Sequence, residues 1–172
     1  MSDILNQNIS HMQDLRDRGR SAEADALIVA FARAANRTQD ELVKLAQTFQ
    51  AISRDYAAKR EGKTAHFMRG QAFDMYERAA LMDTNNADLA LDTAKAALEY
   101  AFRAAAFRHT RRALDNDIGN AEAWSFLGKL LDGSGEAVLA NACRDNAQAA
   151  SEGRINDIDR TAKLPQPKVS RP

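Results

Sequence analysis

The sequence has little of several residue types on which other classes of protein depend. Of its 172 residues one is cysteine, three are proline and 6% are aromatic, and 24 basic side chains balance 24 acidic ones. A lone cysteine excludes an internal disulfide and a multi-cysteine metal site. The balanced charge produces no long-range field that would attract nucleic acid or anionic membranes. We therefore do not expect nucleic-acid binding to be the main function.

Long apolar segments are also missing. The longest apolar run, Ala26 to Ala32, has seven residues. A helix that crosses a bilayer needs about 20. The first residues carry an early acid, Asp3, and no basic run before an apolar stretch, which argues against a signal peptide. We expect a cytoplasmic protein without membrane insertion.

Alanine is the residue type in clear excess, with 34 copies. Alanine has the highest helix propensity and lets neighbouring helices approach closely. The prolines, which would interrupt helices, are confined to positions 165, 167 and 172. The composition therefore predicts an all-α fold.

Helical periodicity and turn signals divide the first half into four expected helices. Apolar residues recur at helical spacing on both sides of Gly19, which predicts two helices joined by a turn. Thr38 followed by Glu41 forms a capping-box pattern, which predicts a third helix that runs to about Arg60. A fourth helix is expected over Thr64–Met82.

The second half contains a 34-residue period. Asn86-Ala87-Asp88 returns as Asn120-Ala121-Glu122, and each triplet precedes an expected helix. The same shift aligns two columns of alanines, which are Ala72, Ala106, Ala140 and Ala79, Ala113, Ala147. The two columns lie seven residues apart, so they occupy one helical face. This spacing indicates a repeat of helix pairs.

The segment from Trp124 to Leu131 resembles the tetratricopeptide (TPR) motif, W-x₂-L-G-x₂-Y, with Leu127 and Gly128 at the leucine and glycine positions and Leu131 in place of tyrosine. A second, weaker copy begins at Leu42. Residues 87–120 keep the second-helix alanines but have Ala90, Thr93 and Ala94 where the tryptophan, leucine and glycine would stand. The stretch between Phe49 and Ala72 is longer than a standard repeat, which indicates either an elongated helix pair or a plain helical bundle.

The resemblance implies a TPR-like solenoid of antiparallel helix pairs, with about three repeats and an atypical first half. We predict one helical repeat domain over 1–152, TPR-like from about residue 39. A short capping helix over 153–163 is expected to cover the last repeat, because Ile155 and Ile158 are apolar. Residues 164–172 are expected to form a disordered, basic, proline-rich tail.

TPR arrays bind protein segments in a concave groove lined by the first helix of each repeat, and the resemblance implies a protein or peptide partner here. The predicted partner-binding residues are Asp40, Val43, Gln47, Gln50, Asp88, Leu91, Lys95, Leu98, Glu122, Ser125, Lys129 and Asp132. The alternative is that these are ordinary solvated positions.

A concentrated basic patch comprises Arg103, Arg108, Arg111 and Arg112, which surround His109. It could contact a phosphate backbone, but we favour a solvated helix whose arginines face Asp115 and Asp117. The histidines fall on separate expected helices, and no catalytic serine, carboxylate pair or phosphate loop is recognisable. We therefore predict no cofactor, no metal site and no enzymatic activity.

The sequence favours a non-catalytic protein-binding adaptor, scaffold or assembly chaperone. The alternative is a self-assembling structural protein, such as a shell or filament subunit, in which alanine surfaces mediate subunit contacts. The two differ in oligomeric state, which the sequence leaves open.

Overall fold

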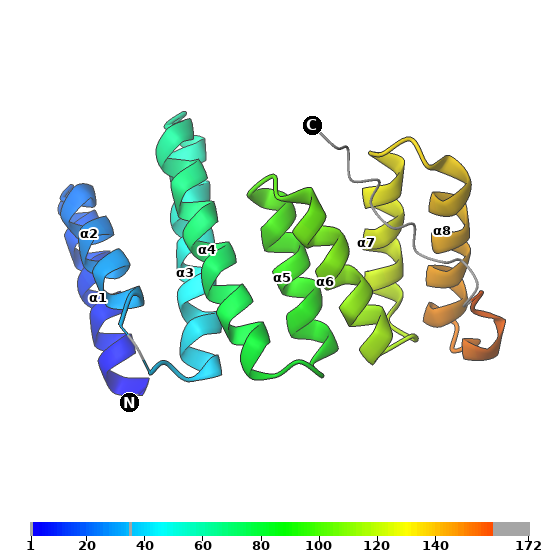
Figure 1. Ribbon diagram of the computed structural model, residues 1–172. Coiled ribbons are helices and arrows are strands. Elements are labelled where there is room, and N and C mark those ends of the chain that lie inside the picture. Colours follow the sequence, from blue (N-terminus) through cyan, green and yellow to red (C-terminus); the bar gives the residue numbers. More distant parts are fainter. Residues whose placement is uncertain (1, 35, 160–172) are drawn as a thin grey trace, which may run out of the picture. The chain divides into compact units, whose positions relative to one another are not determined.

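The computed structural model describes residues 2–34 and 36–159. These residues form helices and connecting turns, and none of them lies in a strand, which confirms the all-α prediction (Figure 1). The elements in chain order are α1 (Ser2–Asp17), α2 (Ser21–Ala32), α3 (Gln39–Ala58), α4 (Gly62–Met82), α5 (Ala87–Glu99), α6 (Arg103–Asn116), α7 (Ala121–Asp132), α8 (Ala137–Ser151) and the 3₁₀ turn η1 (Ile155–Asp157).

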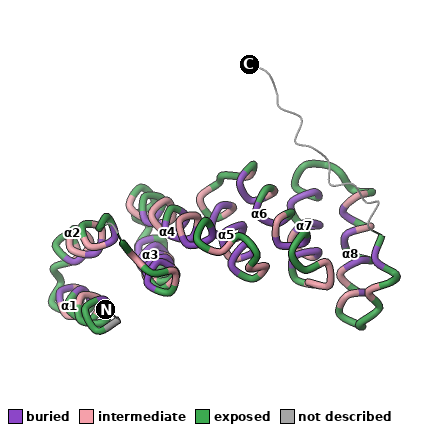
Figure 2. The backbone as a smooth tube through the Cα atoms, turned by 60° about the horizontal axis from the view of Figure 1, so that its bottom comes forward, coloured by how far each residue is buried: buried purple, intermediate pink, exposed green. Residues whose placement is uncertain are grey.

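Consecutive helices form antiparallel, TPR-like pairs within two compact units, Met1–Asp83 and Thr84–Pro172. In the first unit α1 pairs with α2 and α3 with α4; in the second α5 pairs with α6 and α7 with α8 (Figure 1). Buried and exposed residues alternate along each helix, as expected for amphipathic helices that bury one side (Figure 2). The single domain expected over 1–152 stays a prediction, and the units are described separately.

The first unit contains the elongated helix pair that the sequence offered as one of two alternatives. Helix α3 has 20 residues and α4 has 21, whereas α5 and α6 have 13 and 14. The predicted capping box begins α3: the backbone N–H of Glu41 donates to Thr38 Oγ1, and the Thr38 N–H donates to the Glu41 carboxylate. Extra turns in α3 and α4 therefore account for the long stretch between Phe49 and Ala72.

The 34-residue period of the second unit is visible in its helix caps. The Asn86 side chain accepts a hydrogen bond from the N–H of Leu89 at 2.9 Å, and the Asn120 side chain accepts one from the N–H of Ala123 at 2.9 Å. Each asparagine satisfies a backbone donor that the first turn of a helix leaves without a partner. The two triplets found in the sequence thus begin α5 and α7 in the same way.

Small residues let α7 and α8 lie close together. A Cβ atom at Gly128 would stand 3.3 Å from the Ala140 carbonyl oxygen, tighter than an ordinary van der Waals contact. Trp124 and Leu131, both at most 3% exposed, fill the space beside this contact. The Trp124 indole N–H donates to the carbonyl of Ile118 at 2.8 Å, so its one polar atom is satisfied.

The predicted alanine columns lie at helix contacts. Five of the six alanines are at most 1% exposed, and Ala147 is half-buried; the five are Ala72, Ala79, Ala106, Ala113 and Ala140. At these buried positions the small methyl side chain leaves room for the neighbouring helix.

The end of the second unit differs from the capping helix expected over 153–163. A 3₁₀ turn, Ile155–Asp157, follows α8, and the chain then extends at Ile158. Ile158 is 6% exposed and packs in the core with Trp124. The Asn146 side-chain amide accepts a hydrogen bond from the Asp159 N–H at 2.9 Å and donates one to the Asp159 carbonyl oxygen at 3.3 Å. Ile158 and the partly buried Ile155 therefore cover the end of the core, and Asn146 holds the chain beside them. The predicted tail, 164–172, lies outside the described residues.

Replacing Ala106 by leucine tests the register of the alanine columns. Three added carbons at a fully buried helix contact should lower the free energy of unfolding of the second unit by about 1–3 kcal/mol. Trp124, the single tryptophan, reports this unfolding by fluorescence in urea. The matched control is Ala104→Leu, exposed on the same helix, which should change stability by less than about 0.5 kcal/mol. Equal stabilities for the two variants would contradict the register.

Candidate functional site

A groove lies between α1 and α3 in the first unit, with a volume of about 420 Å³. We call it the α1–α3 groove. Its floor is apolar, and its rim and one end carry polar and charged side chains. The lining residues are Ile9, Met12, Gln13 and Arg16 of α1 and Lys44, Gln47, Thr48, Ala51, Ile52 and Asp55 of α3.

Two polar contacts hold α1 beside α3. The Lys44 ammonium donates to the Asn6 side-chain oxygen at one end, and Arg16 pairs with Asp55 at 2.6 Å at the other. The contacts are ten residues apart on α1 and eleven apart on α3, so the two helices run parallel. The groove is the space between these two contacts.

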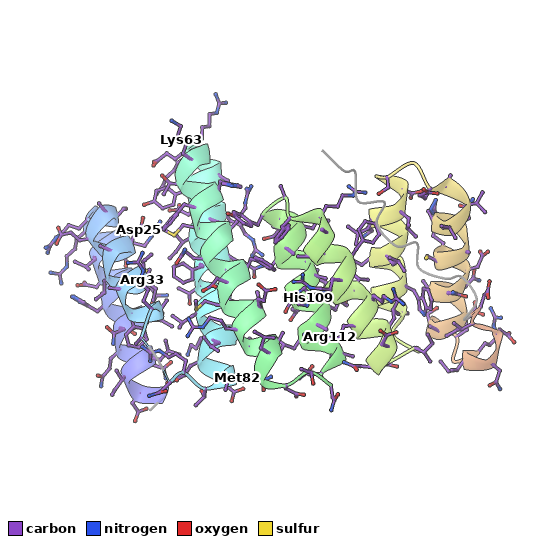
Figure 3. The ribbon with its side chains drawn as sticks, in the orientation of Figure 1. Asp25, Arg33, Lys63, Met82, His109 and Arg112 are labelled. Atoms are coloured by element: carbon purple, nitrogen blue, oxygen red, sulfur yellow. The ribbon has the colours of Figure 1, made fainter. Side chains whose placement is uncertain are left out.

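A charge network closes the Arg16 end of the groove. Arg16 pairs with Asp25 of α2 at 2.7 Å as well as with Asp55, and its side chain is 15% exposed. The Tyr56 hydroxyl donates to Asp25, which lies on the side of α2 that faces α3 (Figure 3). Lys59 pairs with Asp55 at 2.9 Å. One arginine therefore joins three helices, and two cations balance two anions.

The network shifts the pKa values of two of its members. Hydrogen bonds from Lys59 and then from Arg16 lower the pKa of Asp55 below its usual value, so its carboxylate stays ionised. Burial, followed by the hydrogen bond to Asp25, raises the pKa of Tyr56 to about 12, so its hydroxyl keeps its proton. Asp55 and Tyr56 thus each keep one protonation state near neutral pH.

The groove contains one of the predicted partner-binding residues of α3. Gln47 lines it, whereas Asp40, Val43 and Gln50 do not. Asp40 is exposed, Val43 is half-buried, and Gln50 accepts a hydrogen bond from the Tyr76 hydroxyl at 3.4 Å.

The α1 side of the groove was missed in the sequence because α1 carries no TPR signature. The available signal was the helical spacing of Ile9 and Met12, which indicated an amphipathic helix but not which neighbour it contacts. Met12 is 3% exposed and Ile9 is half-buried, so the first forms the floor and the second stays partly accessible.

In the second unit the structure brings two predicted residues together. Lys95 of α5 pairs with Glu122 of α7 at 2.9 Å and with Asp92 at 3.5 Å. Asp132 pairs with Arg144 of α8 at 2.9 Å. The remaining predicted positions on these helices include exposed Asp88 and Lys129 and half-buried Leu98 and Ser125.

The prediction that Leu91 contacts a partner is wrong. Its side chain is 2% exposed and belongs to the core that contains Trp124 and Leu127. Ala90 stands at the sequence position of Trp124 one repeat later, and the adjacent leucine supplies apolar bulk to that core.

The four arginines of the predicted basic patch have different surroundings. Arg103 donates to the carbonyl oxygen of Leu130 and, at 2.9 Å, to the Ser134 hydroxyl, so its charge lies at the end of α7 where helix carbonyls are free. A Cβ atom at Gly133 would stand 2.7 Å from the Arg103 guanidinium, so the glycine leaves room for this contact. Arg103 therefore contacts the end of α7 and not the expected aspartates, and its role in binding stays a prediction.

The other three arginines of the patch differ in exposure. Arg108 and Arg111 are exposed, whereas Arg112 is half-buried on the same helix as buried His109 (Figure 3). Their role in binding stays a prediction.

Within residues 2–34 and 36–159, no cluster of three or more histidine, cysteine, aspartate or glutamate side chains is placed to hold a metal ion. Burial raises the pKa of the Cys143 thiol to about 11, so it is protonated near neutral pH and is a poor nucleophile. None of the helices in the described part of the chain is long and apolar enough to cross a membrane.

Comparisons with known proteins gave structural neighbours only. No protein-family model matches the sequence, and no curated protein matches it. The similar solved structures include the following two. One, described as "Crystal structure of MamA", has 18% identity and a TM-score of 0.48, with 84% of this chain and 96% of that chain covered. The other, "Crystal structure of MamA protein", has 17% identity and a TM-score of 0.47, with 91% and 97% covered.

Arg16→Gln tests the charge network that closes the groove. Removing the guanidinium leaves Asp25 and Asp55 without their shared cation, so the first unit should lose about 1–3 kcal/mol of stability. Hydrogen–deuterium exchange of α1 and α3 peptides in increasing urea measures the loss. Arg18→Gln is the matched control, because Arg18 is exposed in the turn after α1 and pairs with Asp14 of that helix, not with α2 or α3. Its effect should stay below about 0.5 kcal/mol, and equal losses in both variants would contradict the special role of Arg16.

Tyrosine titration tests the environment of Tyr56. The pKa of an unfolded tyrosine is about 10, and the folded value is about 12. Because the folded pKa is higher, the stabilisation from this group is complete below pH about 10 and is lost as the pH rises to about 12. Ultraviolet absorbance of tyrosinate should show a late component that Tyr56→Phe removes and that Asp25→Asn moves to lower pH. A late component that persists in Tyr56→Phe would assign it elsewhere.

Proposed function

We propose that the protein is a non-catalytic adaptor, scaffold or assembly chaperone that holds a segment of a protein partner in the α1–α3 groove. The observation that carries the proposal is the groove itself, an accessible hollow of about 420 Å³ between the first helices of two successive pairs. Pairs of this kind place their first helices side by side, so the groove continues the arrangement that the sequence motif predicts.

The lining suits a peptide better than a small metabolite. Its floor offers the side chains of Ile9, Met12 and Ile52 for an apolar side chain, and methionine adapts its shape to different ligands. Gln13 and Gln47 are exposed amides at the rim, each with donors and an acceptor for the backbone or polar side chains of a bound segment. Apolar contact combined with adaptable amide hydrogen bonds is typical of peptide-binding grooves.

The groove is supported by interactions that keep its walls in place without a ligand. The Lys44 contact with Asn6 and the Arg16 pair with Asp55 fix α1 against α3 at both ends. A preformed groove does not spend binding energy on ordering its own walls. The lining contains no histidine or cysteine, and its one carboxylate is held ionised by cations, which supports binding over catalysis.

Blocking the groove tests the proposal. Ala51 is exposed and lines the groove, so Ala51→Arg should obstruct it with little effect on folding. The full chain and the variant are compared by co-purification from the native host, with partners quantified by mass spectrometry. Ala57→Arg is the matched control, because Ala57 is an exposed alanine of the same helix outside the groove.

Ala51→Arg should lose the partners that the full chain and Ala57→Arg retain. Hydrogen–deuterium exchange of α1–α4 confirms that both variants are folded. If Ala51→Arg retains every partner, the α1–α3 groove is not the binding site.

A further inference from the structure

Among the charged residues that line the α1–α3 groove, Arg16 and Asp55 are paired with opposite charges and Lys44 is not. At the Arg16 end, Arg16 and Lys59 offset Asp25 and Asp55. The low pKa of Asp55 keeps that balance in place near neutral pH. A partner side chain of either sign therefore finds no net attraction at this end of the groove.

Lys44 stands at the opposite end with a different kind of partner. Its ammonium donates to the Asn6 side-chain oxygen, which is neutral. Among the described residues, no carboxylate lies within the 4.0 Å ion-pair distance of Lys44. This includes Asp40, which lies one turn earlier on α3. Lys44 is exposed, and an ammonium group has three donors, so it can bind a further acceptor besides Asn6.

We propose that the α1–α3 groove recognises an acidic, amphipathic protein segment. An apolar side chain of the segment lies over Ile9, Met12 and Ile52, and an aspartate or glutamate of the segment pairs with Lys44. This proposal rests on the proposed function and adds the chemistry of the partner to it. Charge complementarity predicts that the partner segment is negatively charged at this point. Among the charged residues of the lining, Lys44 is the one that no opposite charge offsets within the described residues.

The geometry also fixes where the acid lies relative to the apolar residue. Lys44 and Ile52 are eight residues apart on α3, which is about 12 Å along a helix axis. Met12 and Ile52 form the floor between the two closing contacts, so the apolar side chain enters there and the carboxylate lies toward the start of α3. A basic segment would place its charge against Lys44 and be repelled.

Selection from a phage-displayed library of random peptides tests this proposal on the full-length protein. Peptides are retained when they bind the unmodified chain and Ala57→Arg but not Ala51→Arg, so that binding depends on the groove. We expect the retained peptides to contain an excess of aspartate and glutamate over lysine and arginine, next to an apolar residue. Selection on Lys44→Glu should remove or reverse that excess.

A double-mutant cycle then locates the acid. Changing the peptide acid to its amide should weaken binding to the unmodified chain about fivefold, as for a partly exposed ion pair, and should have little effect on binding to Lys44→Gln. Lys44→Arg should restore the sensitivity, because it keeps the charge. Lys63→Gln is the control, because this exposed lysine of α4 lies outside the groove lining (Figure 3). High salt should reduce the fivefold effect.

The outcomes separate this inference from the proposed function. The acidic partner is overturned if the groove-dependent peptides show no excess of acids. It is also overturned if changing the peptide acid to its amide weakens binding to Lys44→Gln as much as binding to the unmodified chain. Either result leaves the groove as a binding site. If the selection yields no peptide that Ala51→Arg fails to bind, both proposals are wrong.

Discussion

The close approach of paired helices is the constraint on which the rest of this structure depends. At Gly128 and Ala140 the backbone of one helix lies against that of the next, and a single added methyl group already crowds the contact. Each pair buries only part of its apolar surface, so its remaining face needs a neighbouring pair. The alanines that dominate the composition are thus concentrated where helices meet, and larger residues such as Trp124 fill the space beside them.

Packing of this kind positions helices but does not by itself shape a groove. In the first unit that role belongs to Arg16, which binds carboxylates from α2 and α3 while its own helix lines the groove. Dispersion contacts have no preferred direction, whereas the hydrogen bonds of a guanidinium with two carboxylates are directional and allow few arrangements. The arginine therefore fixes the separation of α1 and α3 at one end, and its charge is paired with the two carboxylates.

Local patterns in the sequence were sufficient for the elements and for part of the core. The capping box at Thr38, the asparagine caps one period apart and the alanine columns depend on neighbours within a few residues or on a regular shift. The failures involve contacts over longer separations. Arg103 caps a helix that ends 29 residues later, and the capping helix expected after residue 153 becomes a 3₁₀ turn held by Asn146. Leu91 was assigned to the partner-binding face from its position in the motif. The motif does not indicate that Ala90, in place of tryptophan, lets the adjacent leucine pack in the core.

The motif and the candidate site lie in different places for a physical reason. The TPR-like signature is strongest over Trp124 to Leu131, and its residues are buried because they make the core of a helix pair. A binding surface needs residues that the core does not use, and those vary without disturbing the pair. The α1–α3 groove lies in the first unit, where the signature is weakest. Its exposed residues include Gln13, Gln47 and Lys44, and the Lys44 contact with neutral Asn6 leaves the lysine charge without an opposite charge among the described residues. We therefore expect the residues that select the partner to lie outside the motif, among the exposed side chains of the groove.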